Sequence, residues 1–283
     1  MPVPTPPNSR DTTPSIPRDA LGLGLRIPHY AHLFEHWPDV GYFEIISENF
    51  LERGTPAREK LARVRERYPV VLHGVGLNLL GHAPLDERYL DGLCELAEMV
   101  DAPFVTDHLC WTGAHGFVHH DLLPTPYTPD LVEMAAERAR EVQRRLGRPF
   151  GLENLSSYVT FESSVMTEWD FYAGVVRASG CWFMLDINNV YVSGKNHGFD
   201  PHTYLRAIDY DRVLQAHLAG HTRQSEELIV DTHDHPVCDD VWDLYRFAWS
   251  IGGPFPTLLE WDDRIPPMPE VIAELEKSKS KRA

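Results

Sequence analysis

Cysteine is scarce in this chain, and its cysteines are not arranged in pairs. Four occur in 283 residues, at Cys94, Cys110, Cys181 and Cys238, and no two have the C-x-x-C spacing. This distribution favours reduced thiols in a cytoplasmic protein over a disulfide framework or a structural zinc site. For Cys110, close to His108, a buried structural thiol is expected rather than a redox group.

Long hydrophobic runs are missing as well. No apolar stretch approaches the roughly 18 residues that a membrane-spanning helix needs. Residues 1–19 are rich in Pro, Ser and Thr and lack the apolar core of a signal peptide. The sequence therefore predicts a cytoplasmic protein without membrane contacts, in which residues 1–19 form a flexible Pro-rich tail.

Positive charge is also low relative to negative charge. The chain has 26 Lys and Arg against 42 Asp and Glu, which gives a formal net charge of −16. Because affinity for nucleic acid comes from cationic side chains that displace counterions from phosphates, nucleic acid is not an expected partner. The 15 histidines, together with the many carboxylates, are instead suitable ligands for hard or borderline metal ions.

Short apolar segments alternate with helical patterns along the chain. Eight candidate strands cover residues 21–25, 41–46, 69–72, 103–106, 150–152, 181–185, 212–216 and 257–259. The main helical patterns cover residues 56–68, 86–100, 129–146, 168–179, 239–250 and 268–277, and a short helix is expected at 202–208. This alternation is typical of parallel βαβ units, and eight of them in about 250 residues predict an α/β fold, a (β/α)8 TIM barrel.

The predicted barrel is a single domain over residues 20–277, followed by a short basic tail at 278–283. Two segments interrupt the alternation of strands and helices. Residues 109–128 contain several Gly and Pro and are expected to form an irregular loop over a site, and residues 193–201 are expected to form a second loop.

Six predicted strands run directly into a side chain that can bind a metal ion. These residues are His73, His108, Glu153, Asp186, His217 and Glu260. In a parallel barrel the carboxyl ends of all strands meet at one rim, where active sites lie, so these side chains should converge. Asn189, three positions after Asp186, and Asp231 and His233, in the polar segment after the seventh strand, should reach the same rim.

These nine candidate ligands combine imidazoles, carboxylates and an amide without a thiolate, a set that suits Fe, Mn or Zn. Nine ligands exceed the needs of one ion, and unpaired buried carboxylates are costly. We therefore expect two or three ions, with Glu153 or Asp186 as a bridge. The alternative is that these are ordinary polar residues and that Asp186 only caps the following turn. Asn154, His221 and His235 are expected to support the ligands or bind substrate.

Seven ordered motifs carry a resemblance to a known family. They are His73-Gly-Val-Gly, Asp107-His108-Leu-Cys-Trp, Leu152-Glu-Asn-Leu-Ser-Ser-Tyr158, Leu185-Asp-Ile-Asn-Asn-Val-Tyr-Val-Ser, His217-Leu-Ala-Gly-His221, Asp231-Thr-His-Asp and Leu259-Glu-Trp-Asp262. Over about residues 21–269 the chain resembles the multinuclear non-haem iron-dependent oxidative enzymes. This family includes the iron oxygenase of methanobactin biosynthesis and the enzymes that modify bufferin-type peptides.

The resemblance implies a non-haem iron-dependent oxidoreductase that uses O2 to modify cysteines of a ribosomally synthesised precursor peptide, with a thiooxazole or an oxazolone and thioamide as product. It implies two or three iron ions in a mixed-valence Fe(II)/Fe(III) state, one holding the substrate thiolate and another activating O2. It also implies a small partner protein that recognises the leader peptide.

The same order of ligands resembles the wider superfamily of endonuclease IV and xylose isomerase barrels. In the trinuclear zinc endonucleases the position of Asn189 is a histidine, so the amide here weakens an all-zinc phosphodiesterase site. A metal-dependent sugar isomerase or hydrolase of this superfamily is the alternative function.

Overall fold

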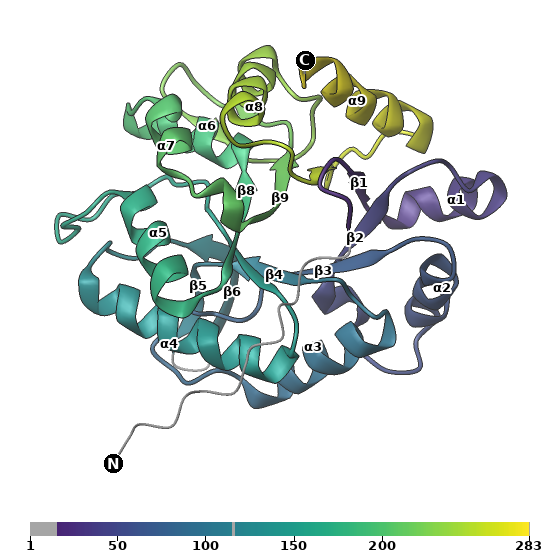
Figure 1. Ribbon diagram of the computed structural model, residues 1–283, viewed down its shortest axis with the longest axis horizontal. Helices are drawn as coiled ribbons and strands as arrows, with labels where there is room; N and C mark the ends of the chain where they lie inside the picture. Colours follow the sequence, from purple (N-terminus) through teal and green to yellow (C-terminus); the bar gives the residue numbers. More distant parts are fainter. Residues whose placement is uncertain (1–15, 115–116, 283) are drawn as a thin grey trace.

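The computed structural model describes residues 16–114 and 117–282, and its centre is a closed barrel of eight parallel strands (Figure 1). In the order in which they lie around the barrel, the strands are β1 (Leu21–Gly24), β2 (Tyr42–Ile46), β3 (Val70–Gly74), β4 (Val105–His108), β7 (Phe150–Glu153), β8 (Trp182–Asp186), β9 (Val213–Leu218) and β12 (Thr257–Leu259). β12 pairs in parallel with β1 and so closes the sheet. The predicted eight-stranded barrel is confirmed.

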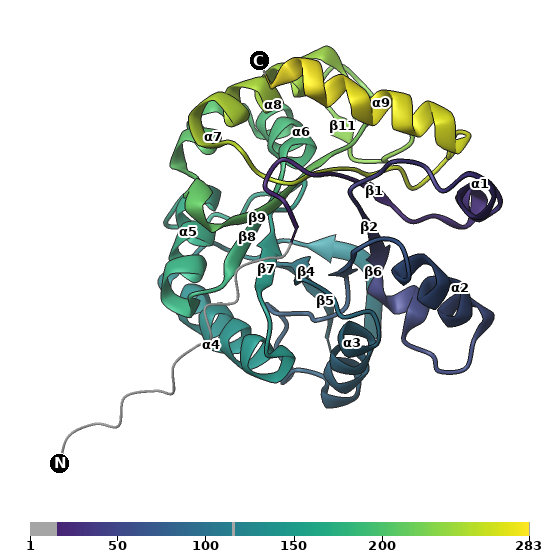
Figure 2. The ribbon, with the colours of Figure 1, turned by 45° about the vertical axis from the view of Figure 1, so that its right-hand side comes forward.

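Helices form a ring around the strands (Figures 1 and 2). They are α1 (Tyr30–His36), α2 (Pro56–Arg65), α3 (Glu87–Met99), α4 (Pro129–Leu146), α5 (Glu168–Ser179), α6 (Ile187–His197), α7 (Pro201–Ala207), α8 (Asp239–Gly252) and α9 (Met268–Lys281), with short 3-10 turns η1 (Ile27–His29), η2 (Ser47–Phe50) and η3 (Tyr210–Arg212). No helix within residues 16–114 and 117–282 combines the length and the apolar character that crossing a lipid bilayer requires.

Local side chains explain where several helices begin and end. Asp86 and Thr167 accept hydrogen bonds from backbone amides in the first turns of α3 and α5, which satisfies donors that have no partner within the helix. α4 ends at Gly147, whose φ of 62° lies in the left-handed region that glycine adopts without a steric penalty. These signals are readable in the sequence, and the boundaries of α3, α4 and α5 agree closely with the predicted ones.

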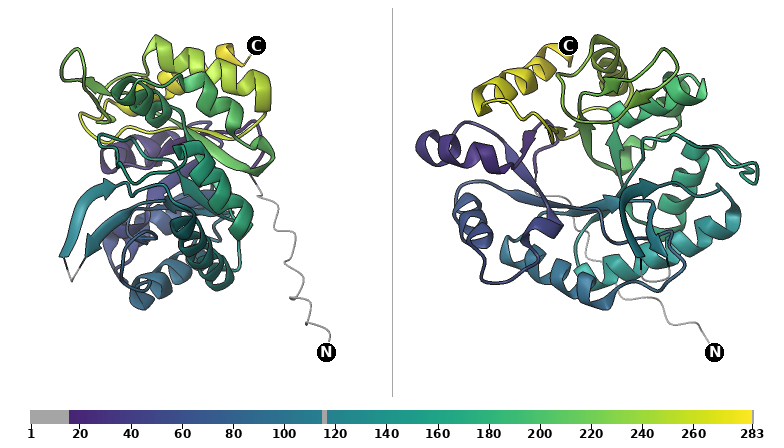
Figure 3. Two further views of the ribbon diagram at one scale, coloured as in Figure 1. Left: turned by 90° about the vertical axis from the view of Figure 1, so that its left-hand side faces the viewer. Right: turned by 180° about the vertical axis from the view of Figure 1, so that it is seen from behind.

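The segment expected to be an irregular loop after β4 instead forms an antiparallel hairpin of β5 (Trp111–Ala114) and β6 (Phe117–Leu123). The hairpin projects from one end of the barrel (Figure 3, left). A second small hairpin, β10 (Thr222–Arg223) and β11 (Ile229–Val230), follows β9. The loop expected from residue 193 is wrong over its first part, because α6 continues to His197. The predicted short helix at 202–208 corresponds to α7.

The two predicted tails are shorter than expected where the structure describes them. Ile16 is only 3% exposed and packs at one end of the barrel with Tyr42 and Leu214. α9 extends through the predicted basic tail to Lys281, and Arg282 donates to the Tyr245 hydroxyl at 2.7 Å. Residues 1–15 and 283, the remainder of the two tails, lie outside the described residues.

The barrel interior changes from apolar to polar along its axis. Tyr42, Val71, Phe104, Leu214 and Leu258 cluster with Ile16. Gly22 makes room for the Tyr42 ring, since a Cβ at that glycine would lie 2.4 Å from the ring. Because residues two apart on a strand point to the same side, Glu44 lies in the interior above Tyr42 and faces the candidate ligands.

Candidate metal centre

The predicted ligands gather at the carboxyl end of the barrel, around a cavity of about 150 Å³. Seven of the nine line it: His73, His108, Glu153, Asn189, Asp231, His233 and Glu260. The other two, Asp186 and His217, are completely buried and lie within 4.8 Å of a Glu153 oxygen through their own ligand atoms. The structure therefore brings together residues that are up to 187 positions apart in the sequence.

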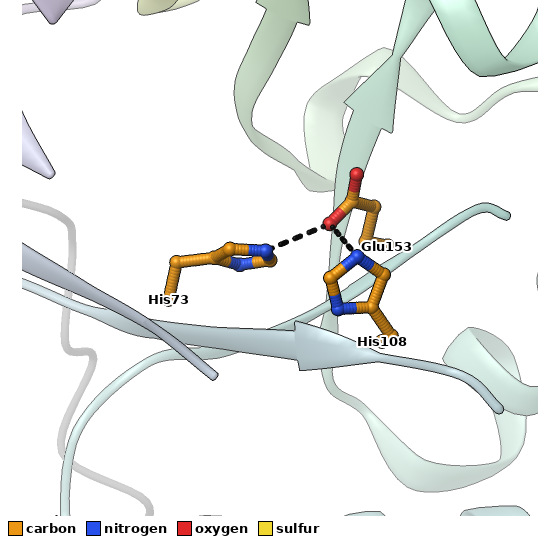
Figure 4. Close-up of side chains that lie close together, drawn as sticks. All are labelled: His73, His108 and Glu153. Atoms are coloured by element: carbon orange, nitrogen blue, oxygen red, sulfur yellow. Dashed lines mark ion pairs between the residues drawn. The ribbon is translucent and has the colours of Figure 1, made fainter. Parts of the chain in front are cut away.

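The first group of potential ligands consists of His73 from β3, His108 from β4 and Glu153 from β7 (Figure 4). Both imidazoles point an Nε2 atom at the same carboxylate oxygen, Glu153 Oε2, at 3.1 and 2.9 Å. Two imidazole nitrogens and one carboxylate oxygen therefore converge, which makes this group a candidate site for one ion.

The second group consists of Glu153, Asp186 and His217. Glu153 thus belongs to two groups and lies between them. His217 also forms a group with Glu44 and Glu260: its Nε2 is 3.0 Å from Glu44 Oε1, and its Nδ1 is 3.2 Å from Glu260 Oε2.

A further group consists of Asp186, His233 and Glu260. Asp186 is shared with the second group, so the four groups form one continuous cluster. His233 Nε2 lies 2.7 Å from Asp231 Oδ1. The backbone of His233 has a φ of 49°, a strained conformation for a residue with a side chain, and such strain is common where a side chain must be aimed at a site.

Each histidine of the cluster has one ring nitrogen held by a hydrogen-bond acceptor of the protein. His73 Nδ1 donates to Thr106 Oγ1 at 2.9 Å, and the Thr106 hydroxyl in turn donates to the Leu72 carbonyl. His108 Nδ1 donates to the Gly74 carbonyl at 3.1 Å. These bonds place the proton on Nδ1, so the Nε2 lone pairs are directed at Glu153, as a metal site requires.

The other two histidines use carboxylates for the same purpose. His233 Nδ1 donates to Asp262 Oδ2 at 2.9 Å, which leaves its Nε2 lone pair toward the cavity. His217 is turned the other way, since its Nε2 donates to Glu44 and its Nδ1 faces the cluster. In all four rings the second nitrogen therefore faces the cluster, where a neutral ring would offer its lone pair to a metal ion.

Several buried polar atoms in this cluster have no hydrogen-bond partner. They are Glu153 Oε2, Asp186 Oδ2, Asn189 Oδ1, His217 Nδ1 and His233 Nε2. Buried polar groups are normally hydrogen-bonded, because leaving one unsatisfied costs about 1–3 kcal/mol. Five unsatisfied donor or acceptor atoms around one cavity fit a cluster of metal ions.

The electrostatics of the acidic residues also favour bound cations. Burial raises the pKa of Asp186 well above its usual value, and the neighbouring charges of Glu153 and Asp231 raise it further. Burial acts in the same direction on Glu153, but the imidazoles of His108 and His73 outweigh it and lower the pKa of this carboxyl. Buried carboxylates in such proximity repel one another unless positive charge lies between them.

Asp186 caps a helix with one carboxylate oxygen and turns the other toward the cluster. Its Oδ1 caps α6 by accepting a hydrogen bond from the Asn189 amide at 2.6 Å, while its Oδ2 faces the cluster without a partner. Asn154 holds the same strand end through two bonds of 2.9 Å to the backbone N–H and C=O of Asp186. Asn189 Nδ2 donates to the Asn154 carbonyl at 3.0 Å, so its Oδ1 is directed away from that bond.

The two remaining predicted supporting residues differ. His221 Nδ1 contacts Asn188 Oδ1 at 2.8 Å, and Asn188 Nδ2 donates to Asp231 at 2.7 Å, so His221 supports a candidate ligand through one residue. His235 contacts Asp234 and does not line the metal cavity. The backbone of His235, however, lies close to Gly220: a Cβ on Gly220 would be 1.9 Å from the His235 carbonyl oxygen. The absence of a side chain at Gly220 therefore allows the loop that holds His233 to pack against it.

Sequence reasoning missed three residues of this centre. Glu44 is in the interior of β2 rather than at a strand end, and an acid within an otherwise apolar strand was the available signal. Arg26 and Asp262 form an ion pair of 2.5 Å, and Arg26 also contacts Glu260 at 3.1 Å. This guanidinium offsets part of the negative charge and holds Glu260 and Asp262 in place.

One family of known proteins matches almost the whole chain. The family described as "RiPP precursor modification enzyme MbnB/TglH/ChrH" matches residues 20–282. RiPP stands for ribosomally synthesised and post-translationally modified peptide. The chain is also 48% identical to a "UPF0276 protein" of Caulobacter vibrioides strain NA1000 / CB15N over 268 residues, which cover 94% of this chain and 95% of that protein.

Two solved structures show the same fold at low sequence identity. A xylose isomerase domain-containing protein from Salmonella typhimurium has a TM-score of 0.66 at 14% identity, with 95% of this chain and 98% of that chain covered. Endonuclease IV from Thermus thermophilus has a TM-score of 0.60 at 19% identity, with 93% and 98% covered. The similarity to these two proteins concerns the fold alone, a xylose isomerase-like TIM barrel.

Proposed function

Because the chain belongs to the RiPP precursor modification enzyme family MbnB/TglH/ChrH, we propose that it uses two or three iron ions and O2 to modify cysteine residues of a ribosomally synthesised precursor peptide. The observation that supports this most strongly is the cluster of four overlapping ligand groups with five unpaired buried atoms. The candidate ligands are His73, His108, Glu153, Asp186, Asn189, His217, Asp231, His233 and Glu260.

The donor set supports iron. It contains four imidazoles, four carboxylates and one amide, and no cysteine of the described residues is part of the groups. Such nitrogen and oxygen ligands suit Fe(II) and Fe(III) as well as Mn or Zn. When bound, iron would supply a Lewis acid that lowers the pKa of a substrate thiol and a redox centre that reduces O2.

The protein's own contribution is to hold the ligands and shape the cavity. Thr106, the Gly74 carbonyl, Glu44 and Asp262 each fix the ring of one histidine, which reduces the reorganisation needed on binding. The walls carry Ile46, Val75, Leu122 and Leu155 beside the candidate ligands. These apolar side chains limit the access of water to the reacting groups.

The size of the cavity supports a side chain of a peptide as the reacting group. A volume of about 150 Å³ admits one side chain but not a folded domain. A flexible precursor peptide meets this requirement, because it can insert a single cysteine while the rest of the chain stays outside. The family resemblance adds a small partner protein that binds the leader peptide, and we include that partner in the proposal.

The experiment is oxygen uptake by protein purified without O2 and supplied with iron. The peptide tested is the short cysteine-containing precursor encoded by a neighbouring reading frame, with and without the product of an adjacent gene as the partner. We expect iron-dependent O2 consumption and a mass change confined to a cysteine-containing fragment of the peptide.

Two outcomes would contradict this proposal. Turnover of a sugar with Mg, Mn or Zn and no O2 uptake would favour the metal-dependent isomerase or hydrolase of the same barrel superfamily. Metal binding without O2 uptake for any precursor from the neighbouring reading frames would make the protein a metal-holding subunit.

A further inference from the structure

A second cavity, of about 230 Å³, lies next to the metal cavity. The segment that follows β7 separates the two. Leu155 and Ser156 line the metal cavity, and the next residue, Ser157, lines the second cavity. The two cavities therefore share one short stretch of wall. Nothing in the proposed chemistry uses the second cavity.

The lining of this cavity is mainly apolar and aromatic. Its apolar part consists of Tyr127, Val159, Phe161, Met166, Trp169 and Phe199. These side chains come from the segment before α4, the segment between β7 and α5, the start of α5 and the connection between α6 and α7. An apolar cavity of roughly 150 Å³ already holds a benzene-sized molecule, so this cavity is large enough for a Leu, Met or Phe side chain.

The cavity wall is held in place although residues 154–167 form no helix or strand. The Val165 amide donates to the Tyr127 carbonyl at 3.0 Å, and the Tyr127 amide donates to Ser164 Oγ at 3.1 Å. At the other end, the Ser157 amide donates to Ser193 Oγ at 3.0 Å. These bonds connect the segment to the start of α4 and to α6, so the cavity exists before any ligand binds.

Glu168 is the one acidic residue among the described residues that line this cavity. Its two carboxylate oxygens accept hydrogen bonds from the hydroxyl groups of Tyr204 and Tyr127, at 3.0 and 3.2 Å. Both oxygens are therefore satisfied within the protein. A ligand in this cavity therefore meets no unpaired carboxylate in the described lining and is recognised by its apolar surface.

Exposed apolar side chains concentrate along the same segment. Among the large hydrophobic residues that are exposed in the described part of the chain, Tyr158, Val159 and Val165 all belong to it, with 44%, 52% and 72% of their surface exposed. Exposed apolar residues next to a ligand cavity are typical of a surface that contacts another molecule.

We propose that this cavity binds an apolar side chain of the peptide substrate, close in sequence to the cysteine that enters the metal cavity. This inference rests on the proposed function, because a peptide that inserts one residue must lay its neighbours across the rim. An extended chain advances about 3.3 Å per residue, and the stretch from Leu155 to Ser157 borders both cavities, so the two inserted side chains belong to residues a few positions apart.

The test is a set of synthetic probe peptides with anaerobically prepared, iron-loaded protein and its partner, so that binding is measured without turnover. Each probe is an N-acetylated seven-residue amide with a central cysteine and glycines elsewhere, and one glycine is replaced in turn by leucine. Isothermal titration calorimetry gives the affinity. We expect leucine at one or two positions to bind about tenfold more tightly than the all-glycine probe, which corresponds to burial of most of the side chain.

A matched pair of variants locates the effect. Val159 lines the cavity, whereas Val165 lies on the same segment outside the lining, and both are exposed enough to accept a lysine. Val159→Lys should abolish the leucine preference, and Val165→Lys should retain it. The inference is wrong if no leucine position improves binding, or if Val159→Lys leaves the preference unchanged.

The binding proposal and the proposed oxidation can be tested independently of each other. A leucine preference that depends on Val159, without O2 uptake by the same protein, would support the cavity and overturn the oxidation. O2 uptake with a precursor peptide but no leucine preference in the probes would support the oxidation and overturn the cavity.

Discussion

Glu44 Oε1 lies 3.0 Å from His217 Nε2, and both side chains are buried inside the barrel. The carboxylate accepts the ring proton, so the Nδ1 atom of His217, which has no hydrogen-bond partner, faces Glu260 and Asp186 with its lone pair. Glu44 is therefore a positioning residue for one candidate ligand. It orients the ring and increases the basicity of the coordinating nitrogen.

Glu44→Ala should weaken the binding of one ion by roughly 10- to 100-fold, the usual effect of removing such a partner. Glu44→Gln keeps an acceptor oxygen for His217 and should recover part of the affinity. Metal content per chain after anaerobic dialysis against chelators of increasing strength measures this. Equal metal retention in all three proteins would show that Glu44 does not position His217.

Glu153 belongs to two ligand groups, and so does Asp186. Alanine at either position should therefore remove more than one ion and abolish activity at the same time. Iron analysis and O2 uptake on the same preparation measure both effects. Retention of the full metal content in either variant would rule out a bridging role for that residue.

Cys110 provides the control for these variants. It is fully buried, and burial raises the pKa of its thiol well above the usual value, with Asp107 and Glu153 adding to the effect, so the group stays protonated. Cys110→Ser should leave the metal content unchanged. Loss of metal from this variant would mean that a thiolate belongs to the coordination sphere.

Gly220 lies at the point where its own segment passes close to the loop that holds Asp231 and His233. Its carbonyl accepts from the His233 amide at 3.1 Å, and an added Cβ would lie 1.9 Å from the His235 carbonyl oxygen. Gly220→Ala should lower the free energy of unfolding by about 1–3 kcal/mol, as overpacking usually does, and reduce metal binding. Thermal unfolding and metal analysis measure the two effects.

Gly92 is the matched control for this substitution. It lies within α3, and a Cβ there would be 3.4 Å from the nearest atom, which is ordinary van der Waals contact. Gly92→Ala should stabilise the protein slightly, because alanine favours helices over glycine. A Gly220→Ala variant as stable as Gly92→Ala would contradict this close packing at Gly220.

Glu168 lies outside the metal centre and should make the free energy of unfolding depend on pH. Burial raises the pKa of this carboxyl to about 7, from 4.5, although Tyr204 and Tyr127 act in the opposite direction. Between these two values the unfolded chain loses the proton while the folded protein keeps it, so the contribution of Glu168 to stability falls as pH rises from about 4.5 to 7 and then levels off.

Glu168→Gln removes this dependence. The free energy of unfolding of the variant, relative to that of the wild type, should increase by up to about 3 kcal/mol between pH 4.5 and pH 8, in line with the size of the pKa shift. Urea unfolding of both proteins across this range measures the difference. A difference that does not change with pH would show that Glu168 is ionised throughout in the folded state.

Much of the fold followed from the sequence, because its signals are local. Buried parallel strands are short apolar runs, and capping residues such as Asp86 and Thr167 mark where helices begin. The convergence of the nine predicted ligands followed from topology, since parallel strands end on one rim. The family resemblance drawn from the motifs is confirmed by the match over residues 20–282.

The features that could not be predicted from the sequence depend on contacts between distant segments. The hairpin of β5 and β6 resembled a loop because its glycines, and Pro124 and Pro126 just after it, are locally unfavourable for strands. Its pairing is visible only in three dimensions. Glu44 was missed because ligands were expected at strand ends and in the segments that follow them, whereas this acid reaches the cluster from within β2. The role of Asp262 could not be inferred, because it depends on its contact with His233, 29 positions away.

The most direct test of the central claim is the metal content of protein produced and purified without O2, determined together with its Mössbauer spectrum. We expect two or three iron ions per chain, with both Fe(II) and Fe(III) present after brief exposure to air. We also expect this iron to be lost from the Glu153→Ala and Asp186→Ala variants. Protein that contains no iron, or that holds iron equally well without Glu153 and Asp186, would contradict this claim.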